Sequence, residues 1–304
     1  MSAVIEVDGL TRSFGGRRGV EGVSFQVGAG EVFGFLGPNG AGKSTTIRLL
    51  LGLYRAGSGQ VRVFGRHPVA DAVAVHARTG YLPGDLALHP RLTGRQHLDR
   101  LGHAAGLTDT RYRDELAERF DAELDRPVRT LSKGNKQKIG LILAFMRRPD
   151  LLVLDEPTSG LDPLLQAEFA ALVAETAGEG RTVFLSSHEL DEVQRLVGRL
   201  SIIRDGRIVV TDTVAGLRRT APRTMSFRFP APVDAGRFAA LEGVRVTASA
   251  PRELTISLSG QLAPVLRLAG ELGAEEATAR PADLDELFLT YYRNHAPRET
   301  SDAR

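Results

Sequence analysis

The sequence contains no cysteine. Disulfide bonds and thiolate metal sites are therefore excluded, which agrees with a reducing compartment. Long apolar runs are also missing, because the longest uncharged stretch near the middle, Ile139–Met146, is far too short to cross a bilayer. The first residues lack the basic and then apolar pattern of a secretion signal. We expect a cytoplasmic chain with no membrane-spanning helix of its own.

An excess of charge of one sign is missing as well. The 39 Lys and Arg residues stand against 37 Asp and Glu, a formal net charge of +2. This excess is too small to indicate a nucleic-acid partner, and none is expected. The length of 304 residues allows one large or two medium domains with apolar cores.

Lysine is scarce, with only four in the chain. Lys43 lies in a glycine-rich segment, and the other three crowd into Leu131–Lys138. A lysine is a compact point charge and an arginine a planar fork, so the two are not interchangeable at a crowded phosphate. This favours Leu131–Lys138 as a second segment that faces phosphate. A chance group of lysines at a solvated helix start is the alternative.

The first lysine belongs to a loop between two apolar runs. Val32–Leu36 predicts a buried strand, and Thr46–Leu51 predicts a helix. A strand, a glycine-rich loop, Lys-Ser and a helix form the phosphate-binding loop in the context it requires. The glycines let backbone N–H groups turn toward a polyphosphate, and the helix adds the positive end of its dipole. An ordinary glycine turn is the alternative. The expected nucleotide ligands are Gly37, Pro38, Asn39, Gly40, Ala41, Gly42, Lys43, Ser44 and Thr45.

Two carboxylates follow the apolar run Leu151–Leu154, which predicts a central parallel strand. Asp155 ends that strand, where a carboxylate that organises Mg²⁺ belongs in such nucleotidases. Because strand side chains alternate, Glu156 is expected to point the other way, placed to polarise an attacking water. Two acids that merely end a strand are the alternative.

The order of elements predicts an α/β fold with two domains. Strands alternate with helices over residues 1–220, and a helical subdomain is expected at about 84–147. Beyond a change of composition at 218–223, the order of strands and helices suggests a small ferredoxin-like α+β unit over 223–295. That unit should end in an amphipathic helix, Leu284–Tyr292, and residues 296–304 are expected to form a disordered tail.

Three motifs together resemble the nucleotide-binding subunit of ATP-binding cassette (ABC) transporters. They are Gly37–Thr45, Leu131–Asn135 and Leu154–Asp162, and Ser187-His188 matches the switch histidine of the family. The resemblance covers roughly residues 3–220. It implies a P-loop NTPase core with an antiparallel β subdomain and a helical subdomain. The C-terminal unit, an α+β domain, looks like the extension found on exporters of the drug-resistance type.

The resemblance also implies a role for single residues. Phe14 would stack on adenine, although ordinary core packing is the alternative for that ring. Lys43 would bind phosphates, Glu156 would act as general base and His188 would sense the γ-phosphate. Ser44 and Asp155 would hold Mg²⁺.

The resemblance further implies that half of each site comes from a second copy. Ser132, Lys133 and Gly134 would bind the γ-phosphate of a nucleotide held by the other protomer, with Asp162 near the seam. We therefore expect a homodimer that encloses two ATP molecules.

The chain departs from the family pattern at two places. The first is the signature motif, Leu131–Asn135, in which Lys133 and Asn135 stand where the family more often has glycine and glutamine. After Leu82-Pro83 the family usually has a glutamine that reaches the magnesium and the attacking water, whereas this chain has Gly84 and then Asp85. Our hypothesis is that Asp85 substitutes as a magnesium ligand, since a carboxylate suits that ion; a water molecule that completes the metal shell is the alternative.

The function that follows is ATP hydrolysis coupled to transport. The chain would power a separately encoded membrane permease that docks on the helical subdomain, and would lie on the inner face of the cell membrane. The resemblance implies export of a drug-like or other hydrophobic substrate. One alternative is a soluble ABC ATPase of translation or DNA repair, although such proteins usually carry two cassettes or a coiled-coil insertion. Another, suggested by Gly84, is a nucleotide-gated regulator with feeble hydrolysis.

Overall fold

The chain divides into two compact units, Met1–Asp212 and Thr213–Arg304. The computed structural model describes residues 3–15 and 17–280, so the helix predicted at Leu284–Tyr292 and the tail at 296–304 lie outside the described residues. The change of unit comes earlier than the composition suggests, because helix α8 (Val214–Thr220) is grouped with the second unit. Within the described ranges, no helix is both long and apolar enough to cross a membrane.

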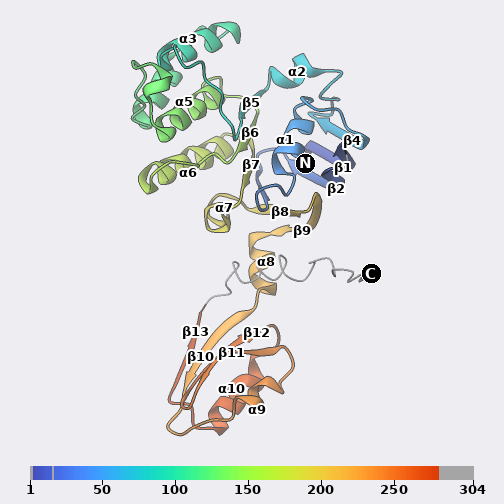
Figure 1. The fold of residues 1–304 in the computed structure, drawn as a ribbon, viewed down its shortest axis with the longest axis vertical. Helices are drawn as coiled ribbons and strands as arrows, with labels where there is room; N and C mark the ends of the chain where they lie inside the picture. The colour runs from blue at the N-terminus through green and yellow to red at the C-terminus, as the bar shows by residue number, and fades with distance from the viewer. Residues whose placement is uncertain (1–2, 16, 281–304) are drawn as a thin grey trace, which may run out of the picture. The chain divides into compact units, whose positions relative to one another are not determined.

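The centre of the first unit is a six-stranded sheet in the order β5-β6-β7-β3-β8-β9 (Figure 1). Neighbouring strands from β5 to β8 are parallel, and β6 and β7 are buried throughout, as the apolar run Leu151–Leu154 predicts for β6. Because β3 and β6 both flank β7, the segments that follow β3 and β6 emerge at the same edge of the sheet. The strands are β3 (Val32–Leu36), β5 (Thr79–Leu82), β6 (Leu151–Asp155), β7 (Thr182–Ser187), β8 (Arg199–Arg204) and β9 (Arg207–Thr213).

A second, antiparallel sheet has the strand order β2-β1-β4, which confirms the antiparallel subdomain. Its strands are β1 (Ala3–Phe14), β2 (Arg17–Gly28) and β4 (Ser58–Val63), and the short helix α2 (Ala72–His76) follows β4. Helix α1 (Lys43–Leu50) lies between the two sheets in Figure 1, and its apolar side chains belong to the core cluster that both sheets share.

Four phenylalanines form the middle of that shared core. Phe184 of the parallel sheet lies with its ring centroid 5.8 Å from Phe25 of the antiparallel sheet and 5.9 Å from Phe33. Phe35 lies 5.5 Å from Phe184 and 5.4 Å from Phe25. These contacts fix the two sheets against each other, because a buried ring cannot move without opening a cavity.

Helices α3 and α5 lie beside β5 and β6, on the side of these strands opposite α1 (Figure 1), as the sequence predicts for the helical subdomain. A capping box starts the first of them, since the Thr93 hydroxyl accepts from Gln96 N and the Gln96 side chain accepts from Thr93 N. The helices are α3 (Gly94–Ala104), α4 (Arg111–Arg119), the 3₁₀ turn η1 (Val128–Thr130) and α5 (Lys133–Phe145), followed along the chain by α6 (Pro163–Gly178) and α7 (Leu190–Leu196).

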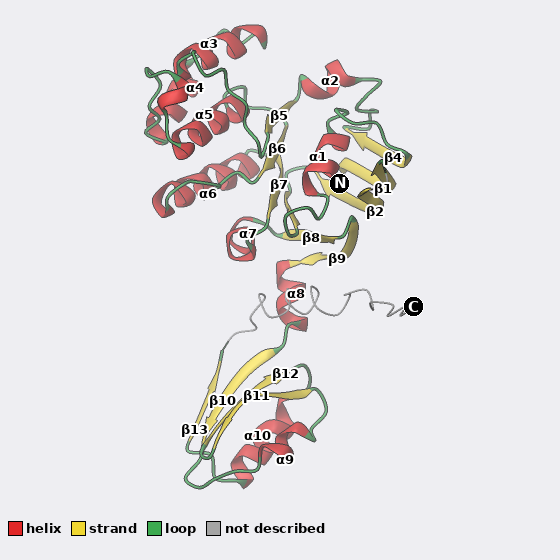
Figure 2. Ribbon diagram, in the orientation of Figure 1, coloured by secondary structure: helices red, strands yellow, loops and turns green. Residues whose placement is uncertain are grey.

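The second unit contains a four-stranded antiparallel sheet in the order β11-β12-β10-β13. With one helix between β10 and β11 and another between β12 and β13, this is the predicted ferredoxin-like topology. Both helices cover the same face of the sheet in Figure 2, where Phe227, Phe229 and Phe238 pack together. The elements are β10 (Arg223–Arg228), α9 (Ala235–Ala239), β11 (Val244–Ala250), β12 (Glu253–Leu258), α10 (Leu262–Glu271) and β13 (Glu276–Ala279).

Candidate nucleotide-hydrolysis site

The glycine-rich loop connects β3 to α1, as the sequence predicts, and each of its glycines is required. Gly40 and Gly42 have φ values of 80° and 110°, in the left-handed region that other residues avoid. Gly37 is required by packing instead, because a Cβ there would lie 2.3 Å from the carbonyl oxygen of Ile203. Gly42 is the N-cap of α1, so the N–H groups of the first helical turn open into the loop without intrahelical partners.

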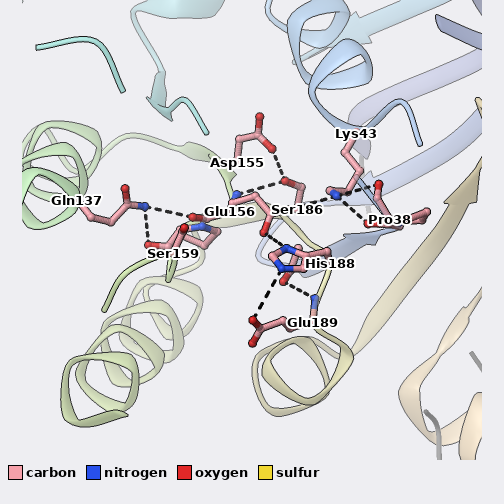
Figure 3. A network of polar contacts seen from close by, with 12 residues as sticks. Pro38, Lys43, Gln137, Asp155, Glu156, Ser159, Ser186, His188 and Glu189 are labelled. Atoms are coloured by element: carbon pink, nitrogen blue, oxygen red, sulfur yellow. Dashed lines mark hydrogen bonds and ion pairs between the residues drawn. The ribbon is translucent and has the colours of Figure 1, made fainter. Parts of the chain in front are cut away.

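Lys43 is buried beneath this loop, with 6% of its side chain exposed. Its Nζ donates to the carbonyl oxygens of Gly37 at 2.6 Å and Pro38 at 3.3 Å. The same ammonium lies 3.1 Å from Glu156 Oε1, and Figure 3 shows it between the loop and the carboxylates. Since that buried oxygen has no hydrogen-bond partner by geometry, the contact is an ion pair and not an aligned hydrogen bond. A buried ammonium in this position can form strong, charge-assisted hydrogen bonds with an anionic ligand.

Asp155 ends β6 and is 3% exposed. Its Oδ1 accepts a hydrogen bond from the Ser186 hydroxyl at 2.5 Å, and among the described residues nothing bonds Oδ2. A Cβ built on Gly84 would lie 3.1 Å from that free oxygen, so the glycine leaves space directly beside it. Burial raises the pKa of Tyr81, and the negative charge of nearby Asp155 raises it further. The site therefore offers one buried carboxylate oxygen to a cation.

Glu156 points away from Asp155, as predicted, but the reason given by the sequence is wrong. Alternation along a strand does not apply, because β6 ends at Asp155 and Glu156 has a φ of 52°. A left-handed turn at a residue other than glycine costs roughly 1–2 kcal/mol and persists only where the surroundings hold it. The Glu156 N–H donates to the carbonyl oxygen of Ser186 at 3.1 Å.

The side chain of Glu156 lies between two nitrogen groups (Figure 3). Its Oε1 is paired with Lys43, and its Oε2 lies 2.7 Å from Nδ1 of His188. His188 is 46% exposed, and its Nε2 lies 3.8 Å from Glu189 Oε1. The structure thus joins the three residues that the sequence predicts to be catalytic into one chain of contacts.

A cavity of about 370 Å³ contains most of the predicted nucleotide ligands. Its volume suits a small-molecule ligand. It extends from Phe14 at the end of β1, past the glycine-rich loop, to the carboxylates after β6. The predicted residues that line it are Phe14, Pro38, Asn39, Gly40, Gly42, Lys43, Ser44, Thr45, Asp85, Asp155 and Glu156.

The oxygen groups in this cavity suit a magnesium ion that is also bound by the phosphate oxygens of a nucleotide. The Ser44 hydroxyl, the free oxygen of Asp155 and the exposed carboxylate of Asp85 line the same space. Within the described ranges, no three His, Cys, Asp or Glu side chains cluster as a metal cage. This pattern fits Mg²⁺, which takes one or two carboxylates and completes its shell with phosphate oxygens and water.

Phe14 is partly buried and is supported from behind by residues that sequence reasoning did not single out. Its ring lies edge-on to Tyr54, with centroids 5.4 Å apart, and the guanidinium of Arg12 lies 5.1 Å from its centroid. Arg48 donates to the Tyr54 hydroxyl at 3.0 Å, and this hydrogen bond is the main reason that the pKa of Arg48 is raised. Arg48 follows the loop on α1, so its place could have been inferred from helical spacing.

The second segment that the sequence predicts to face phosphate lies at the start of α5. Ser132 is the N-cap and its hydroxyl accepts from Asn135 N at 3.1 Å. Lys133 donates to the Ser159 hydroxyl at 2.8 Å and lines another cavity, of about 460 Å³, with Glu156 and His188.

Within the described part of the chain, five predicted ligands line neither cavity, and two of them, Gly37 and Ala41, belong to the glycine-rich loop. The other three are Ser132, Gly134 and Asp162. The Asp162 carboxylate caps α6 by accepting from the N–H groups of Leu164 and Leu165, each at 3.0 Å.

Two buried amides in α5 were also missed as site residues. Asn135, one of the two unusual residues of the signature, accepts from Glu123 N at 2.8 Å and donates to Glu123 O at 2.7 Å, so it holds a loop of the helical subdomain. Gln137 donates to the carbonyl oxygens of Glu156 and Pro157. The lysine-rich sequence around both amides drew attention to charge and not to these backbone contacts.

Comparison with known proteins finds a consistent set of relatives. Residues 20–159 match the family described as ABC transporter. The chain is 37% identical to the daunorubicin resistance ATP-binding protein DrrA3 of Streptomyces coeruleorubidus, over 94% of each chain. It is 36% identical to the bacitracin transport ATP-binding protein BcrA of Bacillus licheniformis, over 69% of each chain. Among solved structures, an ATP-binding subunit of an ABC transporter superimposes with a TM-score of 0.66 and 31% identity, over 71% of this chain and 92% of the other.

Proposed function

The chain belongs to the ABC transporter ATP-binding family, and on that premise we propose that it powers a separate membrane permease that exports a drug-like or other hydrophobic compound. The observation that carries the hydrolytic part is the single cavity lined by Lys43, Ser44, Asp155 and Glu156. The export part is supported by the names of the relatives, which are resistance and transport proteins for daunorubicin and bacitracin. Association with the inner face of the membrane would come through the permease.

Different residues of the cavity would bind different parts of the nucleotide. The loop N–H groups and Lys43 would bind the phosphates, and Phe14 would stack on the base. Ser44 and Asp155 would hold Mg²⁺, which when bound offsets the negative charge of the phosphates. Since Lys43 is paired with Glu156, phosphate oxygens would compete with that carboxylate for the ammonium.

Glu156 is placed for the proton transfer itself. Its carboxylate faces the cavity from the end of β6, and one of its oxygens contacts His188. A carboxylate there can orient a water molecule and accept its proton as the water attacks the terminal phosphate. His188 would then report the presence of that phosphate through its contact with Glu156.

Asp85 is proposed as a further magnesium ligand in place of the glutamine that is usual in the family. Its carboxylate is exposed, lines the cavity and forms no hydrogen bond or ion pair with any described residue. Asp85→Ala should raise the Mg²⁺ concentration needed for half-maximal turnover by about tenfold, the loss of one weak ligand of roughly 1.4 kcal/mol. Turnover and magnesium dependence left intact in Asp85→Ala would contradict this role, and water would then complete the shell.

The dimer is proposed on the signature residues. Ser132 and Gly134 lie at the N-terminus of α5 outside the cavity of their own chain, as expected if they complete the site of a second copy. Lys133 and Asp162 lie beside them in this proposal. Light scattering of the Glu156→Gln variant with ATP and Mg²⁺ should then give the mass of two chains, and a monomer under those conditions would contradict it.

The proposed function is tested by turnover together with capture of the permease. Glu156→Gln should lower ATP turnover by about 10²–10⁴-fold, the usual contribution of general base catalysis, while ATP binding persists. Glu21→Gln is a matched control, because Glu21 pairs with Arg207 on the surface of the same unit and does not line the cavity.

The outcomes separate the candidate functions. Turnover that depends on Glu156, with co-purification of a membrane protein, supports a transport ATPase. The same turnover without a membrane partner would favour a soluble ABC ATPase, and binding without turnover a nucleotide-gated regulator.

A further inference from the structure

The backbone of Glu156 is held by hydrogen bonds on both its N–H and its carbonyl side. This residue has a φ of 52°, and its conformation aims the carboxylate at Lys43 and His188. The N–H side is fixed by Ser186, whose carbonyl and hydroxyl oxygens accept from Glu156 N at 3.1 Å and 3.3 Å. A left-handed residue other than glycine needs a matching restraint on its carbonyl side.

Gln137 of α5 supplies that restraint. Its side chain is buried, and its Nε2 donates to Glu156 O at 3.1 Å and to Pro157 O at 2.8 Å (Figure 3). The two hydrogens of one amide thus bond two successive carbonyl oxygens, which fixes the peptide planes on both sides of Pro157. Ser159 N also donates to Glu156 O, at 3.2 Å, so that this turn closes on itself.

The start of α5 lies along the same segment at two more points. Lys133 Nζ donates to the Ser159 hydroxyl at 2.8 Å. A Cβ on Gly134 would lie 2.6 Å from the carbonyl oxygen of Gly160, so backbone meets backbone there. Helix α5 therefore forms a rigid support for residues 156–160, and Gln137 is its contact with the catalytic end of that segment.

We propose that Gln137 is a positioning residue for ATP hydrolysis, which holds Glu156 in the conformation that aims its carboxylate into the cavity. This rests on the proposed function, because it takes Glu156 as the general base. Gln137 itself does not line the cavity and would not touch the nucleotide.

The test compares Gln137→Met, which keeps the length and removes both donors, with the full-length wild type. A carboxylate displaced by a fraction of an ångström should lower kcat by about 10–100-fold. The KM for ATP and the directly measured ATP dissociation constant should stay within about twofold, because Glu156 is not needed for binding. A parallel change in KM and kcat, or no change in kcat, would overturn the proposal.

Thr176→Val is the control for a general loss of stability. Thr176 of α6 is 0% exposed against 7% for Gln137, and its hydroxyl donates to the carbonyl oxygen of Leu172 at 2.7 Å, but it lines neither cavity. Both variants should lower the thermal midpoint to a similar extent, whereas only Gln137→Met should lower kcat strongly. An equal loss of kcat in both variants would show that Gln137 is merely structural.

A double-mutant cycle separates the proposal from the proposed function. In a Glu156→Gln background, Gln137→Met should cause no further loss of turnover, since the group that it positions is already removed. Independent, multiplicative losses would overturn the positioning role. If instead turnover does not depend on Glu156 at all, the proposed function fails first. Should Gln137→Met fail to fold, Gln137→Asn keeps a buried amide that is one methylene too short and serves in its place.

Discussion

The substitution Gly84→Ala tests where a metal ion would meet the chain. One oxygen of Asp155 is occupied by Ser186 at 2.5 Å, and the other lies 3.1 Å from the position that a Cβ on Gly84 would take. The carboxyl carbon would lie 3.2 Å from it, again closer than ordinary van der Waals contact. Asp155 cannot retreat without losing its bond to Ser186, which costs about 1.5–3 kcal/mol for a charged acceptor. The methyl group should therefore cover the free oxygen.

The expected result is weaker activation by magnesium. Covering one of few protein ligands should raise the Mg²⁺ concentration for half-maximal ATP turnover by about tenfold, or roughly 1.4 kcal/mol. The assay is a magnesium titration of ATP turnover at saturating ATP. Gly198→Ala is the control, because Gly198 has no positive φ and no atom within 4 Å of the added Cβ. If Gly84→Ala titrates like the wild type, the free oxygen of Asp155 is not the metal contact and the reasoning is refuted.

Three further predictions concern the stacking of Phe14 on adenine, the apolar core and the ion pair between Arg119 and Glu175. Phe14→Ala should weaken ATP binding by about tenfold through loss of stacking, while Phe14→Tyr should bind normally, as nucleotide fluorescence would show. Phe184→Ala should lower the free energy of unfolding of the first unit by about 3–5 kcal/mol in urea, since its ring is fully buried. The guanidinium of Arg119 lowers the pKa of Glu175 below its ordinary value of 4.5. The stabilisation that this ion pair contributes is therefore fully present above pH 4.5 and is lost as the pH falls through the lowered pKa of Glu175. Glu175→Gln should cost at most about 1 kcal/mol at pH 7, because the carboxylate is exposed, and urea midpoints of variant and wild type should converge in acid.

The sequence predicted the parts of this protein that depend on local chemistry. Gly37–Thr45 has its loop conformation because glycine adopts the left-handed turns at Gly40 and Gly42 without strain, and Lys43 begins the following helix. The apolar run ending at Asp155 forms a central strand for an equally local reason, since a strand buried on both faces must be apolar throughout.

The second unit was predictable from the order of its elements. Its strands and helices follow one another in an order that few topologies can satisfy, and the ferredoxin-like order is the one observed. Its start was less predictable, because the change of composition at 218–223 begins within α8, whereas the contacts of α8 assign the whole helix to the second unit.

Only the tertiary structure decided how the site is held together. Alternation along a strand gave the right direction for Glu156 but the wrong cause, because its left-handed turn depends on Ser186 and Gln137, both distant in sequence. The pairing of Lys43 with Glu156, and the place of Gly84 beside Asp155, likewise arise where separate segments meet at one sheet edge. A sequence specifies which groups are present and which turns they allow. The distances between groups that lie a hundred residues apart are set by how the sheets, the loop and α5 pack.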